Sequence, residues 1–280
     1  MLGKGQVVAL GAYDAMTSRL AEKCGAGAIY VSGFAGAAAR LGRPDLGLMT
    51  QTEMSEHIQR ICEATTRPVL ADADTGYGGA LNVQRTVRLW ERAGCSGLHI
   101  EDQMFPKRCG HVAGKLVVPV EEMEQKLRAA ADARDDKNFL LIARTDAVAV
   151  EGIEAAIERC KRYSDTGVDG FFVDAPETID QIEEISKQLA PLGRILLFNS
   201  VRTFKSPILS ATELAKLGFG LIIFPVDALL TAYRAIEETY RTLLRTGSTD
   251  DIAEKMVTFS EFNQFIGLSD NIELELKFST

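Results

Sequence analysis

Residues 69–78 read VLADADTGYG, and this stretch decides the fold. Val69–Ala71 is a short apolar run of the kind that forms a strand buried on both faces. Asp72 and Asp74 follow at once, and glycines then end the run. A buried strand that opens directly into acidic residues is typical of α/β proteins, in which polar side chains gather at the carboxyl ends of parallel strands.

The same unit recurs along the whole chain, because short apolar runs alternate with longer stretches whose apolar residues are at helical spacing, as in Ile153–Cys160 and Ile179–Leu189. The predicted strands are Val7–Gly11, Ala28–Val31, Val69–Ala71, Gly97–Ile100, Leu140–Ala143, Gly170–Val173, Ile195–Phe198 and Leu221–Phe224. Eight strands, each followed by a helix, predict the α/β class and a closed (β/α)₈ TIM barrel. An open doubly wound sheet is the alternative, but the nucleotide-binding glycine pattern after its first strand is missing.

One domain is predicted for residues 1–280, because single barrels run to about 250 residues and no linker rich in Pro, Gly or Ser divides the chain. From about residue 249 the sequence predicts a helical extension outside the barrel repeat.

Composition excludes several classes of function. Apolar residues make up 46% of the chain and its formal net charge is −8, so a nucleic-acid partner is not expected. The first ten residues lack the apolar run of a signal peptide, and no segment is long and apolar enough for a membrane span. We therefore expect a cytoplasmic protein with no membrane partner.

The five cysteines are sparse and odd in number, which indicates reduced thiols rather than disulfides or a zinc site. Four of them, Cys24, Cys62, Cys95 and Cys160, lie in predicted helices or at helix ends, where we expect buried apolar roles. Cys109 differs because it lies in a polar loop that contains glycine.

Polar side chains follow six consecutive predicted strands, from the second to the seventh. They are Ser32 and Gly33, Asp72 and Asp74, Glu101 and Asp102, Arg144 to Asp146, Asp174, and Asn199. The carboxyl ends of barrel strands share one face, so we expect these side chains to form a site there.

Asp72 and Asp74 alternate along a strand, so both carboxylates can face one centre, and Glu101 at the next strand end is a third candidate. Such hard oxygen ligands are the ones that Mg²⁺ prefers. The alternative interpretation is a solvated acidic turn.

Arg144 follows a buried run and has the planar fork that recognises carboxylates, which predicts a small carboxylate substrate. The alternative is an internal ion pair with Asp146 or Asp174. Ser32 and Gly33 offer a hydroxyl and backbone N–H groups to an oxyanion.

Cys109 lies between Lys107 and Arg108 on one side and His111 on the other. Nearby positive charge favours the thiolate, so Cys109 is a candidate proton donor or acceptor. A covalent thioester role and a plain surface thiol are the alternatives. We assign no chemistry to the other two histidines, a helix-surface His57 and a strand residue His99.

Five motifs occur together in an order that resembles the isocitrate lyase/phosphoenolpyruvate mutase superfamily. They are YVSG at 30–33, PDLG at 44–47, DADTGYG at 72–78, IEDQ at 100–103 and KRCGH at 107–111. The resemblance extends from Ala12 to about Leu276 and is strongest to 2-methylisocitrate lyases, 2,3-dimethylmalate lyases and oxaloacetate hydrolases. Carboxyphosphonoenolpyruvate mutase shares the KRCGH loop and is the rival.

The resemblance implies a barrel whose last helix is exchanged between subunits of a homotetramer. It also implies a Mg²⁺ ion, which Mn²⁺ could replace, held directly by Asp74 and largely through water by Asp45, Asp72 and Glu101.

The substrate contacts are implied in the same way. Ser32, Gly33 and Phe34 would bind the carboxylate of the oxo-acid half, Arg144 an oxygen of that half, and Gly110, His111 and Asn199 the departing dicarboxylate. Cleavage of a carbon–carbon bond would leave an enolate-like product that Cys109 protonates, with Tyr30 or a metal-linked carboxylate as the base.

Two residues depart from the family pattern. Arg202 stands where the lyases usually have a glutamate, and Asp174 replaces the glutamate after the sixth strand. Because of these two departures, the sequence does not identify the exact substrate. Besides the lyase hypothesis, they motivate a non-catalytic binding role, while a phosphonomutase or phosphonate hydrolase is the second enzymatic alternative.

Overall fold

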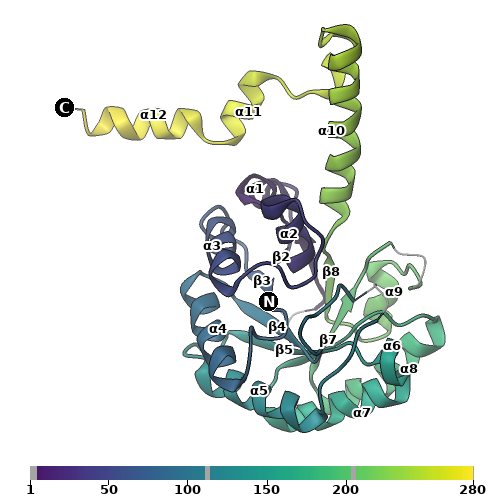
Figure 1. Cartoon of the computed structure of the whole chain (residues 1–280). Helices are drawn as coiled ribbons and strands as arrows, with labels where there is room; N and C mark the ends of the chain where they lie inside the picture. Colours follow the sequence, from purple (N-terminus) through teal and green to yellow (C-terminus); the bar gives the residue numbers. More distant parts are fainter. Residues whose placement is uncertain (1–4, 111–113, 203–205, 280) are drawn as a thin grey trace. The chain divides into compact units, whose positions relative to one another are not determined.

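Eight parallel strands close into a barrel in the computed structural model, which describes residues 5–110, 114–202 and 206–279 (Figure 1). The strands are β1 (Val7–Gly11), β2 (Ala28–Val31), β3 (Val69–Asp72), β4 (Gly97–Glu101), β5 (Leu140–Thr145), β6 (Gly170–Val173), β7 (Ile195–Asn199) and β8 (Leu221–Phe224). Each strand pairs with the next, and β8 pairs with β1, which confirms the predicted (β/α)₈ fold.

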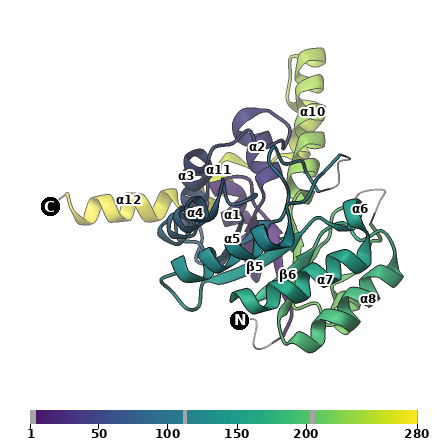
Figure 2. The same ribbon diagram turned by 60° about the horizontal axis from the view of Figure 1, so that its bottom comes forward.

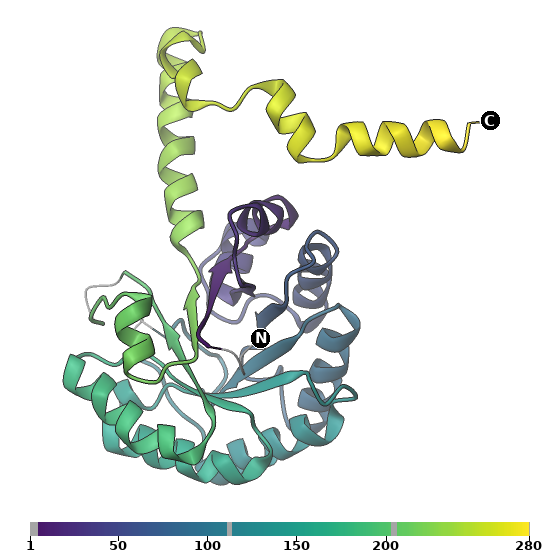
Figure 3. The same ribbon diagram turned by 180° about the vertical axis from the view of Figure 1, so that it is seen from behind.

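Helices surround this barrel, and Figure 3 shows them from behind. They are α1 (Ala15–Lys23), α2 (Gly33–Leu41), α3 (Gln51–Cys62), α4 (Ala80–Arg92), α5 (Val120–Ala133), α6 (Val148–Glu151), α7 (Ile153–Tyr163), α8 (Ile179–Leu189) and α9 (Ala211–Lys216). Short 3₁₀ turns, η2 (Ser164–Thr166) and η3 (Ala190–Leu192), follow α7 and α8. Figure 2 shows α7 and α8 side by side on the outside of the barrel.

Four strands continue one or two residues beyond their predicted ends. Asp72 pairs with His99, and Glu101 pairs with Arg144, so the backbone ladder includes these polar residues. Ending a strand at its first polar residue is wrong here because pairing in a closed barrel depends on the backbone, whatever the side chain. Asp72 and Glu101 are therefore fixed on strands rather than on loops.

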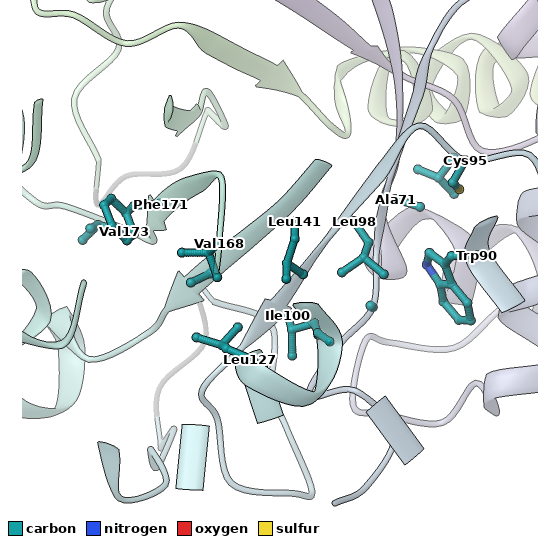
Figure 4. Close-up of a cluster of buried hydrophobic side chains, with 14 of the residues drawn as sticks. Ala71, Trp90, Cys95, Leu98, Ile100, Leu127, Leu141, Val168, Phe171 and Val173 are labelled. Carbon is teal, nitrogen blue, oxygen red and sulfur yellow. The ribbon is translucent and has the colours of Figure 1, made fainter. Parts of the chain in front are cut away.

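The main apolar core lies between the strands and the surrounding helices. Trp90 of α4 and Leu127 of α5 pack there with side chains from the outer face of the sheet, including Leu98 and Leu141 (Figure 4). A second cluster fills the barrel interior and includes Tyr30 and Phe172. This inner layer is the floor beneath the carboxyl ends of the strands.

The chain divides into two compact units, Met1–Leu229 and Leu230–Thr280. The second contains most of α10 (Asp227–Thr246), the 3₁₀ helix η4 (Asp250–Lys255), α11 (Phe259–Phe265) and α12 (Leu268–Lys277). None of α10, α11 and α12 contains a buried residue, although all carry large apolar side chains. No helix among the described residues has both the length and the apolar character that crossing a bilayer requires.

Three smaller expectations are wrong. Cys24 is exposed and Cys62 only half-buried, whereas Cys95 and Cys160 are buried as expected. His57 is 3% exposed rather than on the helix surface, because its imidazole lies beside Gly36 of α2, where an added Cβ would be 3.4 Å from His57 Cδ2.

Candidate active site

A buried lysine joins two acidic loops at the carboxyl end of the barrel. Lys107 Nζ lies 2.6 Å from Asp45 Oδ1 and 2.7 Å from Asp74 Oδ1. Burial alone would lower the pKa of Lys107, but the neighbouring carboxylates, Asp74 foremost, raise it well above 10.5. Burial also raises the pKa of Asp74 to about 6. Lys107 is therefore a cation among the acids, whereas the sequence suggested that it would supply charge to Cys109.

Asp72 orders the backbone around this cluster. Its Oδ1 accepts a 2.9 Å hydrogen bond from the Asp74 N–H, and its Oδ2 accepts a 3.2 Å bond from the Gly33 N–H. A Cβ on Gly33 would lie only 3.1 Å from Asp72 Oδ2 and from Asp74 Oδ1. Asp74 has a φ of 45°, in the left-handed region that non-glycine residues rarely adopt. The backbone at the end of β3 is thus shaped around the two carboxylates.

Glu101 is the third acid and is completely buried. Its carboxylate makes an ion pair with Arg144 Nη1 at 3.2 Å, and neither oxygen has a hydrogen-bond donor in the described part of the chain. Burial raises the pKa of Glu101 well above 4.5. A buried carboxylate without donors is suited to a cation.

These residues fit a Mg²⁺ ion. Asp45, Asp72, Asp74 and Glu101 supply only oxygen donors, and Glu101 has spare acceptor capacity. Among the described residues no three His, Cys, Asp or Glu side chains form a ready metal cage. Mg²⁺ usually keeps several waters and takes only one or two carboxylates, so such a cage is not required.

Arg144 is held by acids on three sides. Its Nε lies 2.9 Å from Asp146 Oδ2, and its Nη2 contacts Asp146 Oδ1 at 3.1 Å and Asp174 Oδ2 at 3.3 Å. With the Glu101 contact, the guanidinium has a fixed orientation at 7% exposure. The internal ion pair that the sequence left as an alternative is therefore present.

The loop that carries Cys109 closes onto this arginine. Gln103 holds one limb of the loop through two hydrogen bonds to the Arg108 backbone. Its Nε2 donates to the Arg108 carbonyl at 2.8 Å, and its Oε1 accepts from the Arg108 N–H at 2.9 Å. Gly110 lies so close to the site that a Cβ there would be 1.7 Å from Asp174 Oδ2 and 2.7 Å from Arg144 Nη2. Cys109, half-buried, is its direct neighbour. His111 lies outside the described residues.

Asn199 is the last residue of β7 and adds an amide to the polar side chains at the strand ends. Its Nδ2 donates a 3.3 Å hydrogen bond to Asp174 Oδ1, while its buried Oδ1 has no partner in the described part of the chain. Asp174 therefore links Asn199 to Arg144. Arg202, the other departure from the family pattern, has an exposed side chain.

Tyr30 points into the barrel, where its hydroxyl lies 2.8 Å from His99 Nε2 and the two rings stack with centroids 5.8 Å apart. Burial raises the pKa of Tyr30 well above 10, so it is a neutral phenol. His99 is buried beneath the acids, with Nδ1 3.7 Å from Asp72 Oδ1. It therefore supports the site, although the sequence suggested no role for it.

The predicted oxyanion residues lie at the N-terminus of α2. Ser32 is buried and makes no capping hydrogen bond, Gly33 begins the helix beside Asp72, and Phe34 is half-buried. Their backbone N–H groups are at the positive end of the helix dipole, which favours a carboxylate.

One partner of the site was missed from the sequence. Lys115 is buried and pairs with Asp146, although it follows the KRCGH motif by several residues. Asp146 was expected among the polar residues at the strand ends and as an alternative partner of Arg144, and it does contact Arg144.

Comparison with known proteins gives a consistent result. Residues 2–244 match the family model described as phosphoenolpyruvate phosphomutase. A 2,3-dimethylmalate lyase of Eubacterium barkeri is 40% identical over 99% of this chain and 95% of its own. A 2-methylisocitrate lyase of Aeropyrum pernix is 40% identical over 94% and 84% of the two chains. A chloroplastic carboxyvinyl-carboxyphosphonate phosphorylmutase of Arabidopsis thaliana is 41% identical over 99% and 82%.

Solved structures agree with these relatives. Oxaloacetate acetylhydrolase with the inhibitor 3,3-difluorooxalacetate superposes with a TM-score of 0.92 at 35% identity, covering 98% of this chain and 92% of the other. Phosphonopyruvate hydrolase with oxalate and Mg²⁺ superposes with a TM-score of 0.89 at 28% identity, covering 98% and 95%.

Proposed function

Because the chain belongs to the phosphoenolpyruvate mutase/isocitrate lyase superfamily, we propose that its site is that of a Mg²⁺-dependent lyase of small 2-hydroxy- or 2-oxo-carboxylates. The relatives named as lyases indicate that the reaction is cleavage of a carbon–carbon bond. The substrates in their names, 2,3-dimethylmalate and 2-methylisocitrate, together with the oxaloacetate of the acetylhydrolase, support 2-hydroxy- or 2-oxo-di- and tricarboxylates as the substrate class.

The observation that carries the proposal is the position of the Cys109 loop. Gly110 is packed against Arg144 and Asp174, and this supports a place for the neighbouring Cys109 beside the cluster of acids. A lyase needs a proton donor there, because cleavage leaves a carbanion that must be protonated.

Asp74, Asp72, Asp45 and Glu101 would hold the metal, which Mn²⁺ could replace. When bound, the ion supplies Lewis-acid stabilisation of negative charge on oxygen. Its support is the oxygen-only donor set and the Mg²⁺ in the phosphonopyruvate hydrolase structure.

The protein residues bind and orient the substrate. The Arg144 guanidinium, fixed by Asp146, binds an oxygen of the oxo-acid half, and Ser32, Gly33 and Phe34 at the N-terminus of α2 receive its carboxylate. Gly110, His111 and Asn199 bind the departing carboxylate half.

Proton transfers occur at two named positions. For a hydroxy-acid, a carboxylate of the metal set, such as Glu101 in its ionised form, takes the hydroxyl proton. Burial raises the pKa of Glu101 and so makes its carboxylate a stronger base, whereas Tyr30 is a neutral phenol and fits this role less well. The carbon–carbon bond then breaks, the electron pair stays on the departing half as an enolate, and Cys109 Sγ–H donates the proton to carbon.

Assembly as a homotetramer with exchange of the last barrel helix is part of the proposal. The apolar side chains of α10–α12 are exposed, among them Leu244 at 89% and Phe259 at 84%, and exposed apolar surface of this kind marks association. Light scattering after gel filtration measures the mass directly, and a monomer of 30.5 kDa would contradict it.

The experiment compares wild type with Cys109→Ala in the presence of Mg²⁺ and four substrates: 2-methylisocitrate, 2,3-dimethylmalate, oxaloacetate and phosphonopyruvate. Wild type should release an oxo-acid or oxalate from one of the first three, and the variant should lose about 10²–10⁴-fold in kcat, the range for one acid–base group. Equal turnover by both proteins would remove Cys109 from the mechanism.

Phosphonomutase or phosphonate hydrolase activity is the second candidate, favoured by the phosphorylmutase relative. Phosphorus NMR with phosphonopyruvate tests it, because cleavage or rearrangement of the carbon–phosphorus bond moves the phosphorus resonance. Such a change without release of carbon-cleavage products would assign this activity instead.

A further inference from the structure

A second lysine in the Cys109 loop is buried, on the limb that returns to the barrel. The side chain of Lys115 is only 2% exposed. Its Nζ lies 3.0 Å from Asp146 Oδ1 and also donates to the carbonyl of Gly110, the residue after Cys109. One ammonium group thus links both limbs of the loop to the end of β5.

The acceptor of this ion pair is part of the arginine site. Asp146 is completely buried, and its two oxygens also bind Nε and Nη2 of Arg144. Its backbone N–H donates a 2.9 Å hydrogen bond to Asp102 Oδ1, which fixes the backbone that carries this carboxylate. Lys115 and Arg144 therefore share one rigid anchor.

We propose that Lys115 is a positioning residue that holds the Cys109–Gly110 segment against Arg144 through its contacts with the Gly110 carbonyl and Asp146, and so sets the position of the Cys109 thiol relative to the substrate. The proposal rests on the proposed proton-donor role of Cys109. Lys115 itself touches no reacting atom in this assignment.

The contacts of Gly110 explain why such a residue is needed. The backbone at Gly110 lies against two charged side chains, Asp174 and Arg144. Placing a backbone carbonyl there buries an acceptor, which costs free energy unless a donor reaches it. Lys115 is that donor, and Asp146 neutralises its charge.

The test measures the position of the loop apart from the chemistry. Wild type, Lys115→Met and Lys115→Arg are treated with iodoacetamide, and alkylation of Cys109 is followed by mass spectrometry, with the exposed Cys24 as the internal reference. In Lys115→Met the rate at Cys109 relative to Cys24 should rise about tenfold, since alkylation follows access to the thiolate. Lys115→Arg should fall between the two.

Kinetics on the same proteins separate positioning from general stability. Lys115→Met should lower kcat about 100-fold, the effect of a misplaced catalytic group, with a smaller change in KM. The matched control is Lys126→Met. Lys126 is a buried lysine that contacts the Thr75 carbonyl and pairs with Glu122, and among the described residues it makes no hydrogen bond or ion pair with the Cys109 loop. Its Cys109 alkylation should equal that of wild type.

Two results would overturn the proposal. One is unchanged Cys109 alkylation in a folded Lys115→Met protein, with folding checked by circular dichroism. The other is faster alkylation in the Lys126→Met control to the same degree. An active Cys109→Ala protein would instead refute the proposed function, and the alkylation rates would still report whether Lys115 holds the loop.

Discussion

The ammonium of Lys107 lies 2.7 Å from Asp74 Oδ1, with both side chains buried at the end of the barrel. A second contact, 2.6 Å to Asp45, makes this lysine the counter-ion of the proposed metal ligands. The positive charge of the lysine and that of a bound metal ion would thus neutralise the same group of acids.

Lys107→Met should destabilise the metal-free protein by about 3–5 kcal/mol, the usual result of removing one partner from a buried ion pair. Mg²⁺ should then stabilise the variant more than wild type, because the ion neutralises acids that have lost their lysine. Thermal unfolding with and without Mg²⁺ measures both effects. Equal Mg²⁺-induced shifts in Tm in the two proteins would show that lysine and metal do not share these acids.

Gly110→Ala should prevent the loop from closing, because the added Cβ would lie 1.7 Å from Asp174 Oδ2. Activity should fall about 100-fold or more, since the thiol is displaced. Gly79→Ala is the control, as a Cβ there meets nothing within 4 Å and its φ of −79° suits alanine. If Gly110→Ala keeps wild-type kinetics, the loop does not close onto Asp174 during turnover.

Arg144→Lys keeps the charge but loses the fork that contacts Asp146 through two nitrogens. We expect kcat/KM to fall about 100-fold through loss of orientation. Arg134→Lys, at the Asp169 ion pair, provides the comparison because Arg134 precedes β5 at the opposite end of the strand. Steady-state kinetics on the preferred substrate measure kcat/KM for both variants. Similar kcat/KM values for Arg144→Lys and Arg134→Lys would show that Arg144 has no role in binding.

The buried His57 should make the free energy of unfolding depend on pH. Burial, with a smaller effect of Arg40, lowers the pKa of His57 to about 4, against an opposing effect of Asp14. A histidine whose pKa is lower in the folded state adds stability above its unfolded pKa of about 6.5, and this is lost as pH falls toward 4.

Urea unfolding of wild type and His57→Gln at pH 7.5, 6 and 5 measures this component. The free energy of unfolding of wild type should fall more steeply with decreasing pH than that of the variant, which has no imidazole to protonate. Parallel curves for the two proteins would show that His57 titrates normally in the fold.

Much of this molecule could be predicted from sequence because the relevant signals are local. The apolar run of Val69–Ala71 and the acids after it predicted both a strand and its functional end, and the same unit repeated eight times predicted the barrel. Strand ends were misplaced where polar residues such as Glu101 stay in the backbone ladder, which no apolar pattern reveals.

The sequence by itself determined the fold class and the residue types available for chemistry, since hydrophobic periodicity depends only on neighbours along the chain. Only the tertiary structure decided which charges meet. Lys107 joins Asp45 and Asp74, and Lys115 joins Asp146, across segments far apart in sequence. Such pairs form because closing the barrel buries several acids at one face, where each charge requires a partner, and the identity of that partner depends on distances in space.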